Sequence, residues 1–303
     1  MKVLVTGGTG YVGRFIVEEL IRAGHEVAVA GRQPLKAGFF SAPVAFKPMT
    51  LDPAAIDPNG FSGIDAVVHT AFHHISGRYR GGEGDDAAGF RRLNLDGSIA
   101  LFRATKTAGI RRLAFISSRA VYGTQPPGAV LTEYTPPVPD TLYGEVKLKA
   151  ENALAALISP DFAAASLRLT GVYGPGGPGR DHKWTAHFTD RFAGKPIAPR
   201  CGTEVHGADA ARAVRLVLES DTLDGHAIFN VSDLLVDRRD ILALFDEAAG
   251  IASPLPALAP NRKTFNTMAT DRLRSLGWQP GGWALFEETV RQLARQFLKE
   301  LRS

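Results

Sequence analysis

The first half of the chain alternates short apolar runs with segments whose apolar residues recur at helical spacing. The apolar runs lie at residues 3–5, 27–30, 66–69, 113–117 and 165–169. They are continuous rather than alternating, which is typical of strands buried on both faces of a parallel sheet. Between them, helices with one apolar stripe each are predicted over residues 14–23, 94–108 and 142–156. Strands separated by helices predict βαβ units, and hence an α/β fold with a doubly wound parallel sheet.

The pattern loosens in the last third of the chain. Residues 174–179 are rich in glycine and proline, and shorter helices are predicted over 208–218, 239–249 and 286–301. We therefore expect two parts. Residues 1–170 form the sheet domain, and residues 171–303 form mainly a smaller α/β lobe for substrate, with some segments returning to the core of the first domain.

Composition and charge exclude several classes of protein. Apolar residues make up 45% of the 303 positions and charged residues 22%, as in soluble globular proteins. No apolar run approaches the ~20 residues that span a bilayer, so no membrane contact is expected. The net charge of +4 is dispersed, which argues against a nucleic-acid partner. One cysteine, Cys201, and no secretion signal favour the cytoplasm and exclude a multi-cysteine metal site, and no metal is expected.

A glycine-rich turn follows the first strand, with the spacing Gly7-x-x-Gly10-x-x-Gly13. Glycines allow a tight turn and let the backbone approach a pyrophosphate, whose charge the following helix N-terminus stabilises. The turn predicts an NAD(P)-binding Rossmann domain over residues 1–170. The expected cofactor contacts are Gly7, Thr9, Gly10, Tyr11, Val12 and Gly13.

The end of the second strand bears on the choice of dinucleotide. A site for NAD usually has a carboxylate there, which binds the ribose hydroxyls. This chain has Gly31 followed by Arg32, and a guanidinium at this point pairs well with a 2′-phosphate. The sequence predicts NADP, with NAD as the alternative.

A tyrosine and a lysine four residues apart, Tyr143 and Lys147, share one face of the helix at 142–156. An ammonium there favours the phenolate, so Tyr143 is suited to general acid/base catalysis beside a nicotinamide ring. Ser118 follows a parallel strand, at the edge where ligands of such sheets bind. We predict that it donates a hydrogen bond to the substrate oxygen.

These features together resemble the extended short-chain dehydrogenase/reductase superfamily, in its NAD-dependent epimerase/dehydratase family. The resemblance runs along nearly the whole chain, through Asn94 with Gly97, Arg168 and Val172-Tyr173-Gly174-Pro175 to Leu276-Gly277-Trp278. It implies a catalytic triad of Ser118, Tyr143 and Lys147, and a homodimer built on the helices at 90–108 and 142–156. The further cofactor contacts that it implies are Thr50, Leu51, Thr70, Ala71, Phe72, Asn94 and Val172, with Tyr143 and Lys147 also touching the cofactor.

Departures from the family pattern narrow the chemistry. Arg119 and Ala120 stand where 4,6-dehydratases carry an acidic residue. Gly171 and Gly202 stand where 4-epimerases carry the Asn and Arg that contact a nucleotide diphosphate. A small, carbohydrate-like hydroxy-carbonyl substrate is therefore expected. Its predicted contacts are His73, Ser118, Arg119, Gly171 and His182.

Three functions remain open at this point. The favoured one is an oxidoreductase that moves hydride between NADP(H) and such a substrate. The alternatives are a nucleotide-sugar 4-epimerase with tightly bound NAD, and a non-catalytic dinucleotide sensor. Binding alone does not need the tyrosine, so the triad argues against the sensor.

Overall fold

The computed structural model describes residues 1–74, 82–223 and 225–301. Its centre is a seven-stranded parallel sheet in the order β3-β2-β1-β4-β5-β7-β10. The strands, in chain order, are β1 (Lys2–Thr6), β2 (Glu26–Gly31), β3 (Ala45–Pro48), β4 (Ala66–His69), β5 (Arg112–Ser118), β7 (Ala163–Leu169) and β10 (His226–Val231). Since the chain turns back beside β1, the carboxyl ends of β1 and β4 border the crevice in which such folds bind ligands.

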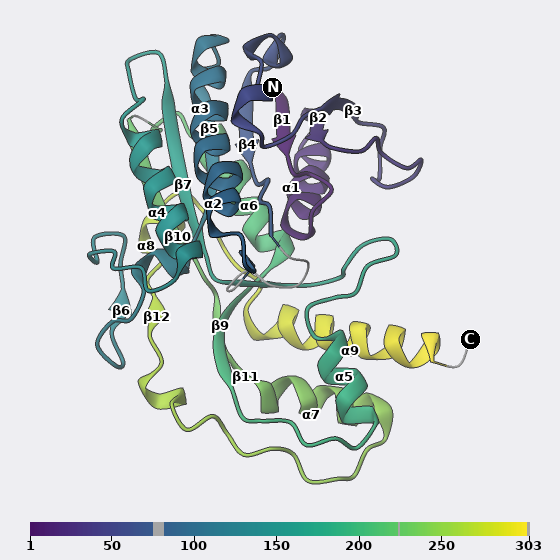
Figure 1. Ribbon diagram of the computed structural model, residues 1–303. Coiled ribbons are helices and arrows are strands. Elements are labelled where there is room, and N and C mark those ends of the chain that lie inside the picture. The colour runs from purple at the N-terminus through teal and green to yellow at the C-terminus, as the bar shows by residue number, and fades with distance from the viewer. Residues whose placement is uncertain (75–81, 224, 302–303) are drawn as a thin grey trace.

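Helices cover both faces of this sheet (Figure 1). One face packs against α1 (Tyr11–Arg22) and α6 (Gly207–Glu219), and the other against α3 (Gly97–Thr107) and α4 (Leu142–Ala155). Alternate residues of each strand enter the two apolar cores: Val3 and Val5 lie in one, and Leu4 lies in the other. This explains why the strands read as continuous apolar runs.

A lobe lies at the carboxyl edge of the sheet, because β8 (Gly171–Tyr173) begins directly after β7 ends (Figure 1). There β9 (Cys201–His206) pairs with β8 and with β11 (Leu234–Asp237). The lobe's helices are α5 (Thr185–Phe192), α7 (Arg238–Ala249) and α9 (Gly282–Glu300), around a core with Trp184, Phe188, Phe245 and Phe286. The remaining short elements are α2 (Ala87–Arg91), β6 (Val130–Leu131), β12 (Thr267–Met268) and α8 (Asp271–Arg274).

The doubly wound parallel sheet predicted from the sequence is confirmed, and each predicted strand is present. The helix predicted from residue 94 is present, but it begins earlier, with α2, and residues Arg92–Asp96 form a π-helical turn before α3 begins at Gly97. The Asn94 side chain binds the backbone of His73, outside the helix, which accounts for the wider turn. Sequence periodicity also missed the edge strands β3, β8 and β10, and β9, the central strand of the lobe's sheet. Within the described residues, no helix is long and apolar enough to span a bilayer.

Candidate active site

The glycine-rich turn has the geometry expected of a pyrophosphate cradle. Gly7 has φ of 70°, and its N–H donates to the Ala30 carbonyl at 3.0 Å. The Gly10 N–H then donates to the Gly7 carbonyl at 2.8 Å, and a Cβ on Gly13 would collide with that same carbonyl. The turn therefore admits no larger residue at positions 7 and 13, and it places the start of α1 directly after the carboxyl end of β1. This arrangement fits the phosphates of a dinucleotide.

Two loops border this turn. Thr70 donates from its hydroxyl to the Thr6 carbonyl at 2.7 Å, and a Cβ on Gly7 would lie 2.7 Å from the Ala71 Cα. On the other side, the Tyr11 hydroxyl donates to the Gly174 carbonyl at 2.7 Å. The segments after β4 and after β8 therefore meet at the turn, where the sequence analysis expected Thr70, Ala71 and Val172.

The residues expected near the adenosine lie at the end of the sheet that holds β2 and β3. Arg32 is exposed, one residue beyond β2. Leu51 follows β3, and its carbonyl packs so closely on Gly97 that a Cβ there would collide with it. Thr50 accepts a bond from the Asp52 N–H at 3.3 Å. Arg32 is thus a solvent-facing cation directly after the carboxyl end of β2.

Tyr143 and Ser118 are brought together by the start of α4. Thr141 caps this helix, its hydroxyl accepting a bond from the Gly144 N–H at 3.1 Å. A Cβ on Gly144 would collide with the Ala120 carbonyl, so the helix begins in contact with the turn that follows β5. In that turn the Ser118 hydroxyl accepts a bond from the Ala120 N–H at 3.1 Å. The first turn of α4 therefore places Tyr143 beside the strand end that carries Ser118.

Lys147 lies below Tyr143 and is almost completely buried, with 4% of its surface exposed. Its ammonium donates to the Ile116 carbonyl at 2.7 Å and lies 4.6 Å from the Phe72 ring centre, 4.7 Å from that of Phe115 and 6.0 Å from that of Tyr143. Burial lowers the pKa of Lys147 to about 7, although the negative charge of Glu151 acts in the opposite direction and raises it. A group that changes charge near neutrality is a good partner for an acid/base tyrosine.

A buried polar network supports this pair from the next turn of α4. Glu151 is 2% exposed and accepts bonds from the Ser117 hydroxyl and, at 2.7 Å, from the Arg168 guanidinium. The same guanidinium lies 4.8 Å from the Tyr122 ring centre. The sequence analysis missed Glu151, although its position four residues after Lys147 already placed it on the same helix face.

Asn94 holds the loop that follows β4. Its side-chain oxygen accepts from the His73 N–H at 2.6 Å, and its amide donates to the His73 carbonyl at 2.7 Å and the Phe90 carbonyl at 3.0 Å. Both polar groups of the His73 backbone are thereby satisfied by one buried side chain. The loop carries Phe72 toward Lys147 and leaves the His73 side chain exposed.

Comparisons with known proteins agree with this geometry. Residues 3–232 match the NAD dependent epimerase/dehydratase family. The chain belongs to this family. It is therefore an NAD(P)-dependent enzyme of the extended short-chain dehydrogenase/reductase type, and the resemblance that the motifs indicated is confirmed.

Its relatives include UDP-glucose 4-epimerases. The one from Corynebacterium glutamicum is 29% identical, over 92% of this chain and 91% of that protein. Among solved structures, the Thermus thermophilus UDP-glucose 4-epimerase in complex with NAD is 29% identical, with a TM-score of 0.77 over 98% of this chain and 99% of that one. The UDP-N-acetylglucosamine 4-epimerase from Methanobrevibacter ruminantium, at 22% identity, shares the fold, with a TM-score of 0.80 over 99% of this chain and 98% of that one.

An ion pair lies beside Gly171, one of the predicted substrate contacts. A Cβ on Gly171 would collide with the Lys183 ammonium and would lie 2.6 Å from a Glu204 carboxylate oxygen. Lys183 and Glu204 form an ion pair, which fills the space beside Gly171. The same carboxylate lies 3.8 Å from the point where a Cβ on Gly202 would stand. Glu204 was not predicted, because only the pairing of β8 with β9 brings it to Gly171.

Two other predicted substrate residues are held by neighbouring protein groups. The Arg119 guanidinium donates to the Asn266 carbonyl at 3.1 Å and lies 5.3 Å from the Phe265 ring centre. His182 accepts a bond from the Trp184 N–H at 3.2 Å and packs on Phe188, and burial lowers its pKa to about 4. Neutral His182 thus belongs to the aromatic core of the lobe, whereas Arg119 borders the turn after Ser118.

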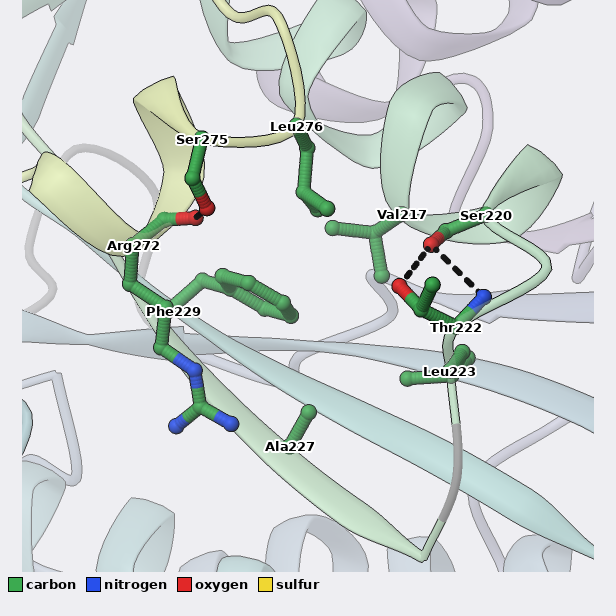
Figure 2. A pocket seen from close by; sticks show the side chains of 9 residues that line it. All are labelled: Val217, Ser220, Thr222, Leu223, Ala227, Phe229, Arg272, Ser275 and Leu276. Carbon is green, nitrogen blue, oxygen red and sulfur yellow. Dashed lines mark hydrogen bonds between the residues drawn. The ribbon is translucent and has the colours of Figure 1, made fainter.

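One cavity lies beside this site and another lies away from it. One of about 310 Å³ is lined by His73, His74 and Phe90, beside the loop that Asn94 holds. The other, of about 190 Å³, lies between the end of α6 and the start of β10 (Figure 2). Its charged lining residue, Arg272, lies 5.2 Å from the Phe229 ring centre. This second cavity is at the amino edge of the sheet, away from the Tyr143 pair.

Proposed function

We propose that the protein transfers hydride between NADP(H) and a sugar-like alcohol or small hydroxy-carbonyl compound. When bound, the nicotinamide ring supplies or accepts the hydride. In the reducing direction the Tyr143 hydroxyl gives its proton to the carbonyl oxygen, while the Ser118 hydroxyl donates a hydrogen bond to that oxygen. Protonated Lys147 stabilises the phenolate left on Tyr143, and the reverse reaction returns the proton. The buried position of Lys147 beside Tyr143 is the observation that carries this proposal.

NADP is the proposed cofactor because Arg32 stands exposed beyond β2, where Gly31 takes the place of the ribose-binding carboxylate. Titration of the wild type, Arg32→Ala and an Arg111→Ala control tests this. A charge-assisted bond contributes about 1.5–3 kcal/mol, so Arg32→Ala should bind NADP about 10- to 100-fold more weakly and bind NAD as before. Arg111, an exposed arginine just before the start of β5, should have no effect. Equal affinity of the wild type for NAD and NADP would contradict the proposal.

The ion pair beside Gly171 supports a substrate without a nucleotide diphosphate. At both glycines, Gly171 and Gly202, this chain brings the Glu204 carboxylate close instead of a neutral or cationic side chain. A carboxylate repels a diphosphate and accepts bonds from hydroxyl groups. Lys183 neutralises Glu204, so the pair suits a hydroxyl-bearing substrate better than a polyanion.

A nucleotide-sugar 4-epimerase is the second candidate, and the similarity to UDP-glucose 4-epimerases over most of the chain favours it. Calorimetric titration of the cofactor-loaded protein with UDP, dTDP and their hexoses distinguishes the two. Weak or absent binding, with release of cofactor during turnover of small hydroxy-carbonyl compounds, is expected. Micromolar binding of UDP-glucose, with cofactor retained through purification, would establish the epimerase instead.

A further inference from the structure

Phe72 touches both members of the Tyr143–Lys147 pair. Its ring centre lies 4.6 Å from the Lys147 ammonium and 5.1 Å from the Tyr143 ring centre, with the two rings nearly perpendicular at 84°. A third contact, at 5.4 Å between ring centres, joins Phe72 to Phe90. Phe72 is therefore in contact with the acid/base pair from outside the helix that carries it.

A second ring completes the surroundings of the lysine. Phe115, on β5, lies 4.7 Å from the ammonium, and the neighbouring Ile116 carbonyl accepts its hydrogen bond. Aromatic faces attract a cation, but they cannot replace the hydration that burial removes. The two rings therefore shield Lys147 from water and at the same time favour its charged form.

The loop that carries Phe72 is fixed from the far side. Asn94 binds both the N–H and the carbonyl of His73, the residue next to Phe72. Asn94 is 1% exposed and stands in the π-helical turn that precedes α3. Turns of this kind are frequent at functional sites, and here the turn sets where the ring of Phe72 lies.

We propose that Phe72 is a positioning residue: its ring and that of Phe115 form a cage that holds the Lys147 ammonium beside Tyr143, and Asn94 fixes the backbone that carries the Phe72 ring. The inference rests on the proposed roles of Tyr143 and Lys147. Its test measures the protonation of Lys147 directly and needs no substrate, so its failure is distinct from failure of the proposed function.

The charged and titratable groups around Lys147 come from several elements. Glu151 lies on α4 and raises the pKa of Lys147, against the lowering by burial. Burial is the main cause of the lowered pKa values of His69 on β4 and of His74 after it, and the charge of Lys147 lowers both further. Tyr143 is a further titratable neighbour. Glu151 and His69 lie on α4 and β4, outside the loop that carries Phe72, whereas the Tyr143 and His74 rings pack on the Phe72 ring.

The experiment is a pH titration of the lysine Nζ resonances in the full-length ¹⁵N-lysine protein, assigned with Lys147→Met. Phe72→Ala admits water, so the Lys147 midpoint should rise by about one pH unit or more. Phe72→Leu keeps an apolar cover but loses the ring face, so the midpoint should fall by about half a unit or more. Phe72→Tyr keeps the ring face and should retain the wild-type midpoint.

Phe90→Leu is the matched control, since it removes a ring that packs on Phe72 but does not contact Lys147. It should leave the midpoint unchanged. An unchanged midpoint in Phe72→Leu, a rise in both the Ala and Leu variants, or an equal shift in Phe90→Leu overturns the proposal. The Leu variant decides the question by itself if Phe72→Ala does not fold.

Discussion

Lys147 is held by one carbonyl and two ring faces, with Glu151 one helical turn away. Burial of this single side chain lowers its pKa to about 7, while Tyr143 stays close enough to respond to its charge. Glu151 is itself neutralised by Arg168 at 2.7 Å, so it opposes the effect of burial only in part. At the residue scale, the chemistry of the site depends on how far water is excluded from one ammonium.

Replacement of Tyr143 by Phe removes the proposed proton donor and keeps the ring that packs on Phe72. General acid/base groups contribute about 10²–10⁴ in rate, so turnover should fall by about that factor. Cofactor affinity should change little. Steady-state kinetics with a small hydroxy-carbonyl panel, together with NADP titration, measures both. Full activity in Tyr143→Phe would exclude the proposed mechanism.

Stability should depend on pH through Lys147. The folded state lowers its pKa from 10.5 to about 7, so between these values the unfolded chain binds more protons than the folded one. The free energy of unfolding should therefore rise from pH 7 toward pH 10 by a contribution of at least about 1 kcal/mol, roughly the value of one pKa unit. Below pH 7 Lys147 is charged in both the folded and the unfolded state, so the cost of burying its charge lowers the free energy of unfolding in full.

Urea unfolding of the wild type and Lys147→Met across this range measures the effect. The methionine fills a similar volume without a charge, so the variant should be more stable than the wild type near pH 7 and should lack this contribution to the slope. Parallel stability curves for the two proteins would show that Lys147 keeps an ordinary pKa.

Three elements converge on the cofactor region, and each does so through a close backbone approach. The first turn of α1 closes on Gly7, α3 begins where Gly97 meets the Leu51 carbonyl, and α4 begins where Gly144 meets the Ala120 carbonyl. At each of these points a Cβ would collide with a carbonyl oxygen. At the element scale, the absence of a side chain decides where a helix starts relative to the strand end beside it.

Gly13→Ala tests this dependence. The added methyl would meet the Gly7 carbonyl and the Gly8 Cα at 2.8 Å, and neither backbone group has room to move. We expect a loss of about 1–3 kcal/mol in unfolding free energy and at least about tenfold weaker NADP binding. Gly60→Ala is the control, because nothing lies within 4 Å of its Cβ position. Unchanged NADP affinity in Gly13→Ala would place the phosphates elsewhere.

In the whole molecule, the lobe closes the carboxyl edge of the sheet through β8, which follows β7 directly (Figure 1). Tyr11 ties the loop after β8 to the glycine-rich turn, and Glu204 enters the same region from β9. We therefore expect substrate contacts and cofactor contacts to come from different parts of one continuous edge. In the proposed reaction, hydride passes between a cofactor and a substrate that are both bound at this edge.

The outer surface of α3 and α4 is where we expect two copies of the chain to associate. The family resemblance predicts a homodimer through these two helices, and isologous dimers are the commonest oligomers. Sedimentation at micromolar concentration should show a two-fold increase over the 32.5 kDa chain mass. Arg103, exposed on α3, is a suitable site for a disruptive Arg103→Glu variant, which should shift the protein toward monomer. A wild-type protein that sediments only as monomer would contradict the prediction.

The sequence by itself determined the parallel sheet, the glycine-rich turn and the Tyr143–Lys147 pair. These depend on local periodicity and on spacing within one element, and both can be read directly from the amino-acid sequence. Tertiary structure alone decided what surrounds that pair. Phe72 follows β4 and Phe115 lies on β5, and both reach Lys147 only because these two strands are neighbours in the sheet.

The same distinction explains why Glu204 and the π-helical turn at Asn94 were not predicted. Glu204 reaches Gly171 through the pairing of β8 with β9. The two residues are too far apart in the sequence for a local pattern to predict this contact. Asn94 departs from a regular α-helix because its side chain binds the backbone of a residue far away in sequence, His73. Contacts between distant residues depend on strand order and packing, so the charge and shape of the pocket had to be taken from the folded chain.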